Sequence, residues 1–414
     1  MKLKLLLNTL LQLSLAAASP LTPSPELHER ARLNGLIRGV NLGGWLVLEP
    51  WITPSIFEQA GEGAVDEFTL CQLLGGNARS RLQAHWNSWI TRDDFFRMAA
   101  AGLNYVRIPI GYWAVIRLNG EPYVDGQLEV LDRAIQWARE TGLKVMIDLH
   151  GAPGSQNGFD NSGRRGDVHW GTGDTIQQTL RAIRSLAERY AKISDVVTAI
   201  ELMNEPFPQR GVNIDQLKQF YYDGWGTVYD SNPQTLIVIS DAFQTPTSWN
   251  GFMTAANGFP NSILDTHHYE IFDTNLITWT IDQHVDLAYS FGRDQVSKTD
   301  KPTIIGEWSG ALTDCAKYLN GRGQGARYDG TFPGSYRVGS CAGKSVGTVA
   351  GLSPQDKQNI RRFIEAQMDA GDMGAGWVFW TWKTEGAPEW DMQQLIQGGV
   401  FPQPLTQRQY PRRG

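Results

Sequence analysis

The sequence predicts a single α/β domain built as a (β/α)8 barrel. Eight short apolar runs alternate with segments of helical periodicity, a pattern typical of parallel strands joined by crossover helices. The units cover roughly 370 residues, which suits one barrel with insertions. A doubly wound open sheet is the main alternative, but no Gly-x-Gly-x-x-Gly or P-loop motif supports nucleotide binding. We therefore expect a TIM barrel with loop insertions at the carboxyl-terminal face of the strands.

The expected strands are apolar and β-branched runs, and the expected helices have apolar residues at three- and four-residue spacing. The strands are expected at 37–41, 104–110, 143–150, 196–203, 235–240, 262–269, 303–306 and 376–382. The helices are expected at 66–74, 91–101, 127–141, 174–191, 213–230, 279–291 and 354–370.

Individual residues mark the ends of several elements in the first half of the chain. The first strand leads into a Gly-rich turn that carries Glu49. Pro109 should close the second strand, because proline has no N–H to donate to a sheet ladder. The helix before the third strand has Leu128, Leu131 and Ile135 close to helical spacing.

In the second half, the fourth strand ends before Pro206, which disfavours helix for the residue ahead of it. Residues 310–350 follow the seventh strand and are rich in Gly and Ser, with almost no periodicity. A loop of this length in a compact domain is usually functional, so we expect a pocket wall. Cys315 and Cys341 flank this loop and are the expected disulfide, which leaves Cys71 as a buried free thiol.

Composition excludes some classes of function. The formal net charge is −6, which favours neither nucleic acid nor an anionic membrane surface as a partner. The chain contains 15 Trp, 16 Phe and 13 Tyr, which either build a large core or form flat platforms for sugar rings.

The first residues have the pattern of a secretory signal peptide. Lys2 and Lys4 precede a mostly apolar stretch that ends in small residues, so we expect 1–18 to be removed and the protein to be secreted, extracellular or in the cell wall. Residues 19–33 are expected to be a pro-segment or a flexible arm, and 34–414 the catalytic domain. No later run is long and apolar enough to span a membrane.

Two of the expected strands deliver a glutamate at their carboxyl ends. Glu205 follows the fourth strand, and Pro206 should hold it in an extended conformation. Glu307 follows the seventh strand. Carboxyl ends of barrel strands converge on one rim, so the two carboxyls should meet there. One protonated and one ionised carboxyl fit glycoside hydrolysis.

Other polar side chains cluster at the same strand ends. Arg107 near Glu307 would keep that carboxyl ionised, and Asn204 could bind a sugar 2-hydroxyl. The remaining residues at these ends are His150, His267, His268, Tyr269, Trp380 and Trp382.

Several of these motifs resemble glycoside hydrolase family 5. They are the segments 107–109, 149–150, 203–206, 267–269, 305–307 and 379–380. More narrowly, the segments 38–45, 154–160 and 382–385 resemble those of secreted fungal exo-β-1,3-glucanases. The resemblance covers roughly residues 35 to 400, which is nearly the whole mature chain, and its motifs occur in order.

The resemblance implies a retaining mechanism with Glu205 as acid/base and Glu307 as nucleophile, their carboxyls ~5–5.5 Å apart. It implies that glucose is released from the non-reducing ends of β-1,3-glucan. Glucosyl transfer is chemically possible as well, because a sugar hydroxyl can attack the glycosyl-enzyme in place of water. It implies no metal or other cofactor, no nucleic-acid or membrane partner, and a monomer.

The resemblance also implies roles for the surrounding residues. It assigns Arg107, His150, Asn204, His267 and Tyr269 to the shell that orients the two glutamates. It implies that the terminal glucose and the next sugar are bound by Glu49, Asp160, Trp380, Phe159 and Phe272.

Three other functions fit part of the pattern. An endo-acting β-glucanase of the same family would need an open cleft. A non-catalytic carbohydrate-binding protein of the cell wall would not need both Glu205 and Glu307. A zinc hydrolase could use His150, His267 and His268, but the sequence has no His-Glu-x-x-His motif.

Overall fold

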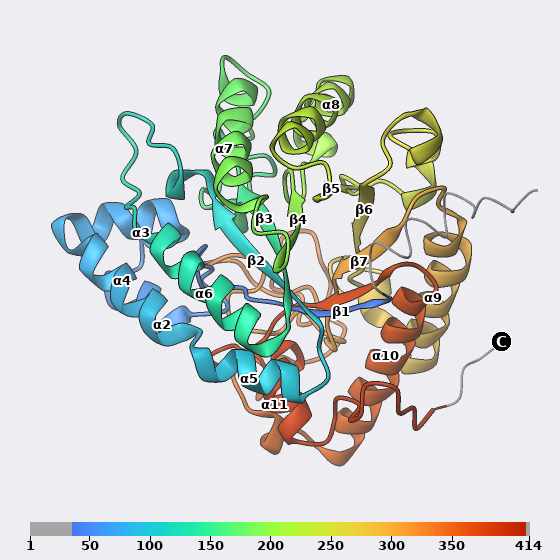
Figure 1. The fold of residues 1–414 in the computed structure, drawn as a ribbon. Helices are drawn as coiled ribbons and strands as arrows, with labels where there is room; N and C mark the ends of the chain where they lie inside the picture. The colour runs from blue at the N-terminus through green and yellow to red at the C-terminus, as the bar shows by residue number, and fades with distance from the viewer. Residues whose placement is uncertain (1–34, 411–414) are drawn as a thin grey trace, which may run out of the picture.

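The computed structural model describes residues 35–410 and contains the eight expected strands in one closed barrel (Figure 1). All neighbouring strands are parallel and follow chain order, and β1 pairs with β8 to close the barrel. The strands are β1 (Ile37–Asn41), β2 (Tyr105–Gly111), β3 (Lys144–Gly151), β4 (Val197–Glu201), β5 (Leu236–Ser240), β6 (Ser262–His267), β7 (Thr303–Glu307) and β8 (Gly376–Phe379).

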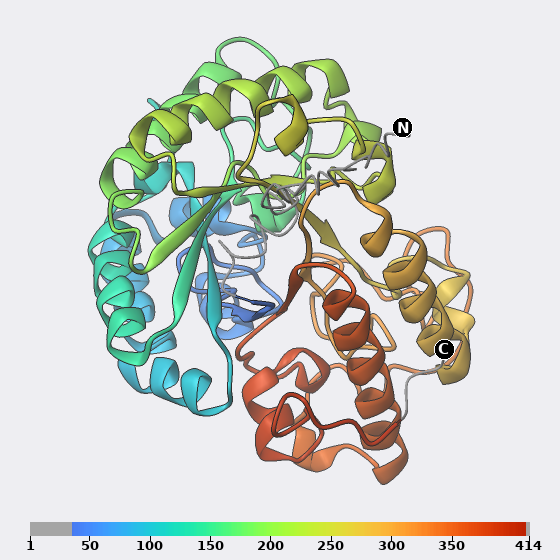
Figure 2. The same cartoon turned by 45° about the vertical axis from the view of Figure 1, so that its right-hand side comes forward.

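The helices surround the barrel in both ribbon views (Figures 1 and 2). Those that the periodicity predicts are α3 (Glu67–Leu74), α5 (Arg92–Ala100), α6 (Gln127–Thr141), α7 (Thr175–Tyr190), α8 (Ile214–Ser231), α9 (Ile281–Asp294) and α10 (Pro354–Asp372). Several begin at side-chain caps, such as Asp66 before α3 and Thr280 before α9. Between β5 and β6 the described chain has only short 3₁₀ turns.

Three described helices were not expected from the sequence. They are α2 (Pro54–Ala60), α4 (Ala78–Trp89) and α11 (Met392–Gln397). Two of them are only six and seven residues long. In α4 the buried residues Ala78, Leu82 and Trp86 lie four residues apart in an otherwise polar sequence. This narrow apolar stripe is too weak to stand out as a helical pattern.

The prediction that Pro109 closes the second strand was wrong, because β2 continues to Gly111. The carbonyl of Arg107 accepts a hydrogen bond from the N–H of Leu42, where the chain leaves β1. Backbone groups two residues apart in a strand face the same neighbour, so the backbone of Pro109 also faces the β1 side. Since β1 has ended at Asn41, no ladder partner is lost there. Three other strands end earlier than expected, β4 at Glu201, β6 at His267 and β8 at Phe379.

The barrel interior has two layers. Toward the amino-terminal ends of the strands it is a small apolar cluster separate from the main core. The main core lies largely between the strands and the surrounding helices. Toward the carboxyl-terminal ends the interior side chains become polar and charged, and most are fully buried.

The long segment after β7 has no α-helix or strand before α10, as its composition predicts. A disulfide joins Cys315 to Cys341 within it, and Cys71 is a buried free cysteine.

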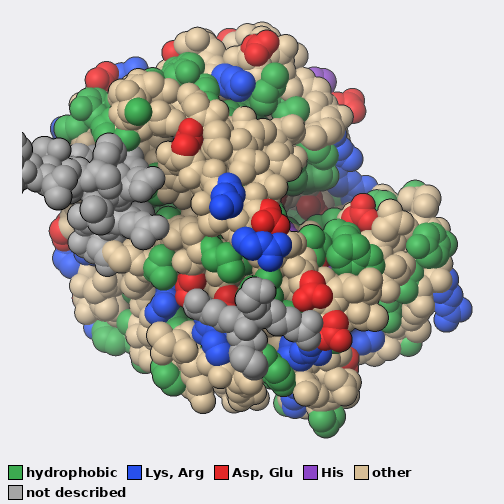
Figure 3. Space-filling view, turned by 90° about the vertical axis from the view of Figure 1, so that its right-hand side faces the viewer, with side chains coloured by type: hydrophobic (Ala, Val, Ile, Leu, Met, Phe, Trp, Pro, Cys, Tyr) green, Lys and Arg blue, Asp and Glu red, His purple; other side chains and the backbone are tan. Residues whose placement is uncertain are grey.

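Charged side chains of both signs are interspersed on the face shown in Figure 3. Within residues 35–410, no helix combines the length and apolarity that crossing a membrane requires. The expected signal peptide at 1–18 and the segment 19–33 lie outside the described residues.

Candidate active site

Glu307 is the last residue of β7, and its carboxyl group is held by two donors. Arg107 donates from Nη1 to Oε1 at 2.9 Å, and the Tyr269 hydroxyl donates to Oε2 at 3.1 Å. Gly306, just before it, has no room for a side chain, because a Cβ there would lie 2.0 Å from the Asp265 carboxylate. The chain therefore fixes Glu307 from both its side chain and its backbone.

Glu205 lies beyond the end of β4 and is buried, but it is not extended as Pro206 led us to expect. Its φ is +47°, in the left-handed region that non-glycine residues rarely adopt. Tertiary hydrogen bonds outweigh the local preference, since Gln156 donates to the Asn204 carbonyl at 2.8 Å and Asn161 to Glu205 Oε2 at 3.0 Å. Strain of this kind is concentrated at functional sites.

The two glutamates meet at His267. One carboxylate oxygen of Glu205, one of Glu307 and a ring nitrogen of His267 all lie within 4.8 Å of one another. His267 Nδ1 is 2.7 Å from Glu205 Oε1 and 3.5 Å from Glu307 Oε2. Retaining glycosidases place their carboxyls about 5–5.5 Å apart and inverting enzymes about 6.5–9.5 Å, so this spacing favours the retaining class.

Arg107 is the centre of a buried charge cluster beneath the pair. Besides Glu307, its guanidinium lies 2.7 Å from Glu201, 3.2 Å from Asp148 and 3.8 Å from Asp265. Burial raises the pKa of Asp148 to about 7 and that of Glu201 to about 8. Burial and the mutual repulsion of neighbouring carboxylates, against a single arginine, therefore keep part of this cluster protonated near neutral pH.

The protons of the two glutamates are coupled through His267. Burial opposes ionisation of Glu205, but the hydrogen bond and charge of His267 outweigh it and lower the pKa of Glu205. Burial raises the pKa of Glu307 to about 8, against the opposing charges of His267 and Arg107. In the empty site the proton therefore favours Glu307, the reverse of what the expected roles require.

This proton distribution is compatible with the expected roles because the pair titrates as a unit. Moving one proton from Glu307 to Glu205 leaves the net charge of the site unchanged. Arg107 and Tyr269 remain as donors for the ionised Glu307. The expected roles require the proton on Glu205 and the charge on Glu307.

His150 and Asn204 complete the lining beneath the pair. Burial and the charge of Arg107 hold the pKa of His150 well below its usual range, so its ring is neutral. Its Nδ1 is 2.6 Å from Asp148, and its ring stacks on Trp380 with centroids 5.4 Å apart. Asn204 accepts from Arg107 Nη2 at 2.8 Å, and its amide nitrogen lies 3.5 Å from His150 Nε2, so one of its two amide hydrogens is left for another acceptor.

A cavity of about 1040 Å³ opens above the two glutamates. All five residues that the sequence assigned to sugar binding line it, namely Glu49, Asp160, Trp380, Phe159 and Phe272. One oxygen of the Asp160 carboxylate is buried without a hydrogen-bond partner among the described residues. Carboxylates and an aromatic face around one cavity suit a sugar ring, whose hydroxyls donate and whose C–H face packs on the ring.

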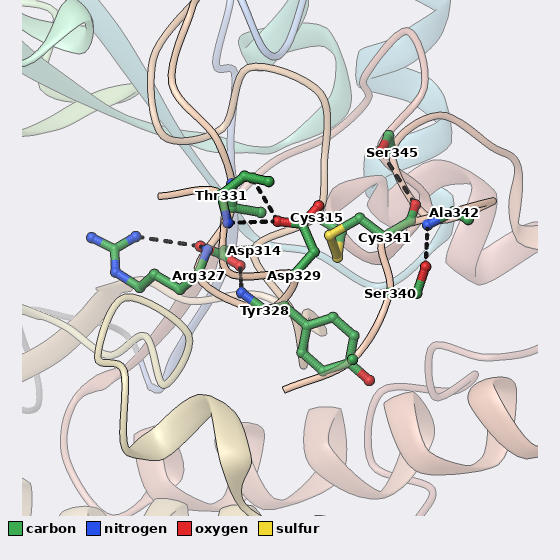
Figure 4. Close-up of a disulfide and its surroundings, with 12 residues drawn as sticks. Asp314, Cys315, Arg327, Tyr328, Asp329, Thr331, Ser340, Cys341, Ala342 and Ser345 are labelled. Atoms are coloured by element: carbon green, nitrogen blue, oxygen red, sulfur yellow. Dashed lines mark hydrogen bonds and ion pairs between the residues drawn. A yellow bond between two sulfur atoms is a disulfide. The ribbon is translucent and has the colours of Figure 1, made fainter. Parts of the chain in front are cut away.

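The disulfide loop contributes residues to the lining of this cavity. Figure 4 shows the disulfide and the side chains around it. Asp314, next to Cys315, accepts from the backbone N–H groups of Arg327 and Tyr328 at 2.7 and 3.0 Å. Asn320 also donates to Asp314, and both Asn320 and Arg327 line the cavity. A buried carboxylate and a covalent bond thus give shape to a segment that lacks regular secondary structure.

The three histidines of the proposed zinc site do not converge. His268 points to the helix layer, where its Nδ1 is 2.7 Å from Gln367 on α10 and its ring stacks on Phe291 of α9. Two other groups, Glu205–His267–Glu307 and Glu201–Asp265–His267, have their atoms close enough together for a cation. In the first, Arg107 and Tyr269 already donate to Glu307, so a cation would compete with these donors.

Sequence reasoning missed several residues of the site. The predicted site did not include Asp148, Glu201 or Asp265, although a charged residue within an apolar run is itself a signal of a functional interior. Other residues of the cavity come from loops, where no periodicity indicates orientation. They include Trp51, Asn161, Arg165, Phe207, Arg210, Phe243 and Arg327.

Residues 71–326 match the cellulase family, described as glycosyl hydrolase family 5. A "Probable glucan 1,3-beta-glucosidase A" from Aspergillus niger is 55% identical over 409 residues, covering 96% of this chain and 97% of that protein. A "Probable glucan 1,3-beta-glucosidase" from Arthroderma benhamiae is 52% identical, covering 97% and 98%. The crystal structure of rutinosidase from Aspergillus niger is similar in fold, with a TM-score of 0.70 at 21% identity, covering 89% of this chain and 99% of that one.

Proposed function

The chain belongs to glycosyl hydrolase family 5, and from this premise we propose that it is a retaining exo-β-1,3-glucanase that releases glucose from non-reducing ends. The observation that carries the mechanism is the approach of a Glu205 and a Glu307 oxygen within 4.8 Å, with His267 between them. The relatives named as glucan 1,3-beta-glucosidases support the substrate class.

In the first step, Glu307 acts as nucleophile and Glu205 as acid. A Glu307 oxygen bonds to the anomeric carbon while the bond from that carbon to the leaving oxygen breaks. Glu205 gives its proton to the leaving oxygen, so the shortened glucan departs as an alcohol. Glu307 becomes an ester with glucose, and the negative charge of the pair is now on Glu205.

In the second step, Glu205 acts as base. It takes a proton from water as the water oxygen attacks the anomeric carbon, and the ester bond to Glu307 breaks. Two displacements on opposite faces retain the anomeric configuration. A sugar hydroxyl in place of water would give glucosyl transfer, for which the aromatic residues at the cavity mouth offer a place to hold an acceptor.

We assign the terminal glucose to the inner part of the cavity. Glu49 and Asp160 accept hydrogen bonds from its hydroxyls, and Trp380 packs against its face. The Asn204 amide is directed to the 2-hydroxyl, where hydrogen bonds strengthen in the transition state. Phe159 and Phe272 bind the next sugar.

The protein is proposed to be secreted and monomeric. The Cys315–Cys341 disulfide and the expected signal peptide support an oxidising, extracellular location. Sizing of the purified protein and N-terminal sequencing of the secreted form test these two points. A dimer in solution, or a mature protein that retains residues 1–18, would contradict them.

The proposed function is tested by following the products formed from a linear β-1,3-glucan by the wild-type enzyme and by Glu307→Ala. Glucose as the sole early product, together with an inactive variant, is expected. Mixed oligosaccharides at early times would favour an endo-acting enzyme with an open cleft. Full activity of the variant would reject the mechanism.

A further inference from the structure

His267 is placed to interact with whichever of the two glutamates is charged. In the proposed reaction the negative charge leaves Glu307 as its bond to glucose forms, and it appears on Glu205 as the proton departs. His267 Nδ1 lies within 3.5 Å of an oxygen of each. A cation at this position would stabilise both arrangements, so the charge state of the imidazole affects both steps.

The other nitrogen of this imidazole faces Asp265. His267 Nε2 lies 3.7 Å from Asp265 Oδ2, and both atoms are buried without a hydrogen-bond partner among the described residues. The second oxygen of Asp265 accepts the N–H of Gly306 at 2.7 Å. Because Gly306 has no side chain, the Asp265 carboxylate fits against the backbone next to Glu307. This backbone contact directs the carboxylate at His267.

We propose that Asp265 is a positioning residue that keeps His267 doubly protonated, so that a positive charge stays between Glu205 and Glu307 through both steps. This proposal rests on the roles proposed above for the two glutamates. Asp265 acts through His267 and touches neither the sugar nor the reacting atoms. Its Oδ2, which also lies 3.8 Å from Arg107 Nε, is the counter-charge that faces His267 Nε2.

The electrostatic surroundings of His267 favour the charged ring. Burial alone would lower its pKa, but Glu307, Asp265 and Glu205 together raise the pKa well above its usual range. The neutral ring of His150 adds no second positive charge. The charged and titratable groups that face His267 or Asp265 are Arg107 on β2, Asp148 and His150 on β3, Glu201 on β4, Glu205 after it, Asp241 after β5, and Glu307 on β7.

The first test compares two substrates in Asp265→Asn, which can still accept the Gly306 N–H but has no charge. On a β-1,3-linked glucose trimer, kcat/KM is expected to fall by about 100-fold, since the charge that develops on Glu205 loses its partner. On 2,4-dinitrophenyl β-glucoside, the leaving group needs no proton, and a loss below about 3-fold is expected. Equal losses on both substrates would reveal a structural role and overturn the proposal.

The second test observes His267 directly by NMR of protein labelled with ¹⁵N-histidine. In the wild type, both ring nitrogens of His267 should carry protons throughout the pH range of activity. In Asp265→Asn, the ring should lose a proton at lower pH, because its counter-charge is gone. A neutral His267 in the active wild type would overturn the proposal even if the variant failed to fold.

Two further variants separate the possible failures. Glu270→Gln changes another buried carboxylate, 2.6 Å from His284 on the helix side, and should leave both substrates unaffected. A substrate-dependent loss there as well would show that the effect is not specific to Asp265. Glu205→Gln should lower kcat/KM on the glucose trimer but leave kcat/KM on the dinitrophenyl glucoside nearly unchanged. If it does not, the proposed acid role fails, whereas the NMR titration still decides the role of Asp265.

Discussion

The two layers of the barrel interior are built on the same strands but differ in chemistry. The lower layer includes Tyr105, Met146, Ala199, Ile263 and Ile304. Two residues further along each of these strands, the upper layer has Arg107, Asp148, Glu201, Asp265 and Gly306. Side chains of a strand repeat their direction every second residue, so both sets point into the barrel. Position in the strand, rather than strand identity, therefore decides whether a residue builds the core or the site.

The difference between the layers shows how stability and function are divided. Burial of the lower layer stabilises the fold, because apolar surface leaves water. The upper layer buries charges that stabilise the fold only while each has its partner, and apolar replacements of such clusters are often as stable. We infer that the upper layer serves chemistry. The lower layer and the outer core compensate for the free energy that burying its charges costs.

The largest effect is expected from Arg107→Met in the upper layer. It leaves Asp148, Glu201 and Glu307 without their cation, so the free energy of unfolding should fall by about 3–5 kcal/mol. Activity should fall by about 10²–10³-fold, as when one electrostatic partner of a transition state is removed. Urea unfolding and glucan kinetics measure both quantities.

Arg139→Met is the matched control for this variant. Arg139 pairs with Asp195 at 2.7 Å, but both side chains are largely exposed. Its loss should cost less than about 1 kcal/mol and leave activity unchanged. If Arg107→Met were no more harmful than Arg139→Met, the contrast between buried and exposed charges would be lost.

A smaller and purely structural effect is expected from Met146→Ala in the lower layer. The cavity left in the apolar cluster should lower the free energy of unfolding by about 2–5 kcal/mol. Although Met146 is the register partner of Arg107 on the neighbouring strand, it belongs to the apolar cluster and supplies no polar group to the site, so kcat/KM of the folded protein should change by less than about 3-fold. A tenfold loss of activity in fully folded protein would show that the two layers are not separable.

The layers should also differ in how pH affects stability. In the unfolded chain Asp and Glu titrate near pH 4, whereas burial raises the pKa of Asp148 to about 7 and that of Glu201 to about 8. Between about pH 4 and the raised pKa values of these two groups, the folded state binds more protons than the unfolded state, so stability falls as pH rises. The expected slope is about 1.4 kcal/mol per pH unit for each extra proton.

This pH dependence can be measured by thermal unfolding between pH 5 and 8. Asp148→Asn should flatten the curve, since its titration is removed, and Met146→Ala should shift the curve without flattening it. A wild type that becomes more stable toward pH 8 would contradict the protonated state assigned to the upper layer.

The smallest effect is expected at the cavity mouth, which extends the comparison to an exposed position. Phe272 is 40% exposed, so Phe272→Ala should leave stability unchanged. The KM for oligosaccharides should rise by roughly 3–10-fold through the loss of one aromatic contact, with kcat unchanged. Phe96→Ala, at a 41% exposed residue of α5, should change neither. An unchanged KM in Phe272→Ala would remove this residue from the binding site.

The order of strands could be predicted from the sequence because each one is a separate apolar run. The prediction failed where tertiary contacts outweighed a local sequence preference. Pro206 favours an extended Glu205, yet contacts from the loop after β3 and from β6 hold the residue at positive φ. Pro109 lies inside a strand because the neighbouring strand has already ended.

The site could be predicted only in part. Most residues at strand ends lie together as predicted, since all carboxyl ends converge. His268 and Trp382 do not, because His268 is hydrogen-bonded to Gln367 on α10 and Trp382 to Asp94 on α5. Asp265 was missed because its role depends on His267 and on the absence of a side chain at Gly306, neither of which is visible in a linear pattern. Asn161 and Arg327 come from irregular loops whose shape is set by long-range contacts and a disulfide.

The central claim is that Glu307 forms the covalent bond to glucose, and trapping the intermediate tests it most directly. The enzyme would be inactivated with 2,4-dinitrophenyl 2-deoxy-2-fluoro-β-glucoside, digested, and its peptides examined by mass spectrometry. The account predicts a single fluoroglucosyl group on the peptide that contains Glu307, attached to that residue. A label on Glu205, or no label from an enzyme that releases glucose of inverted configuration, would contradict it.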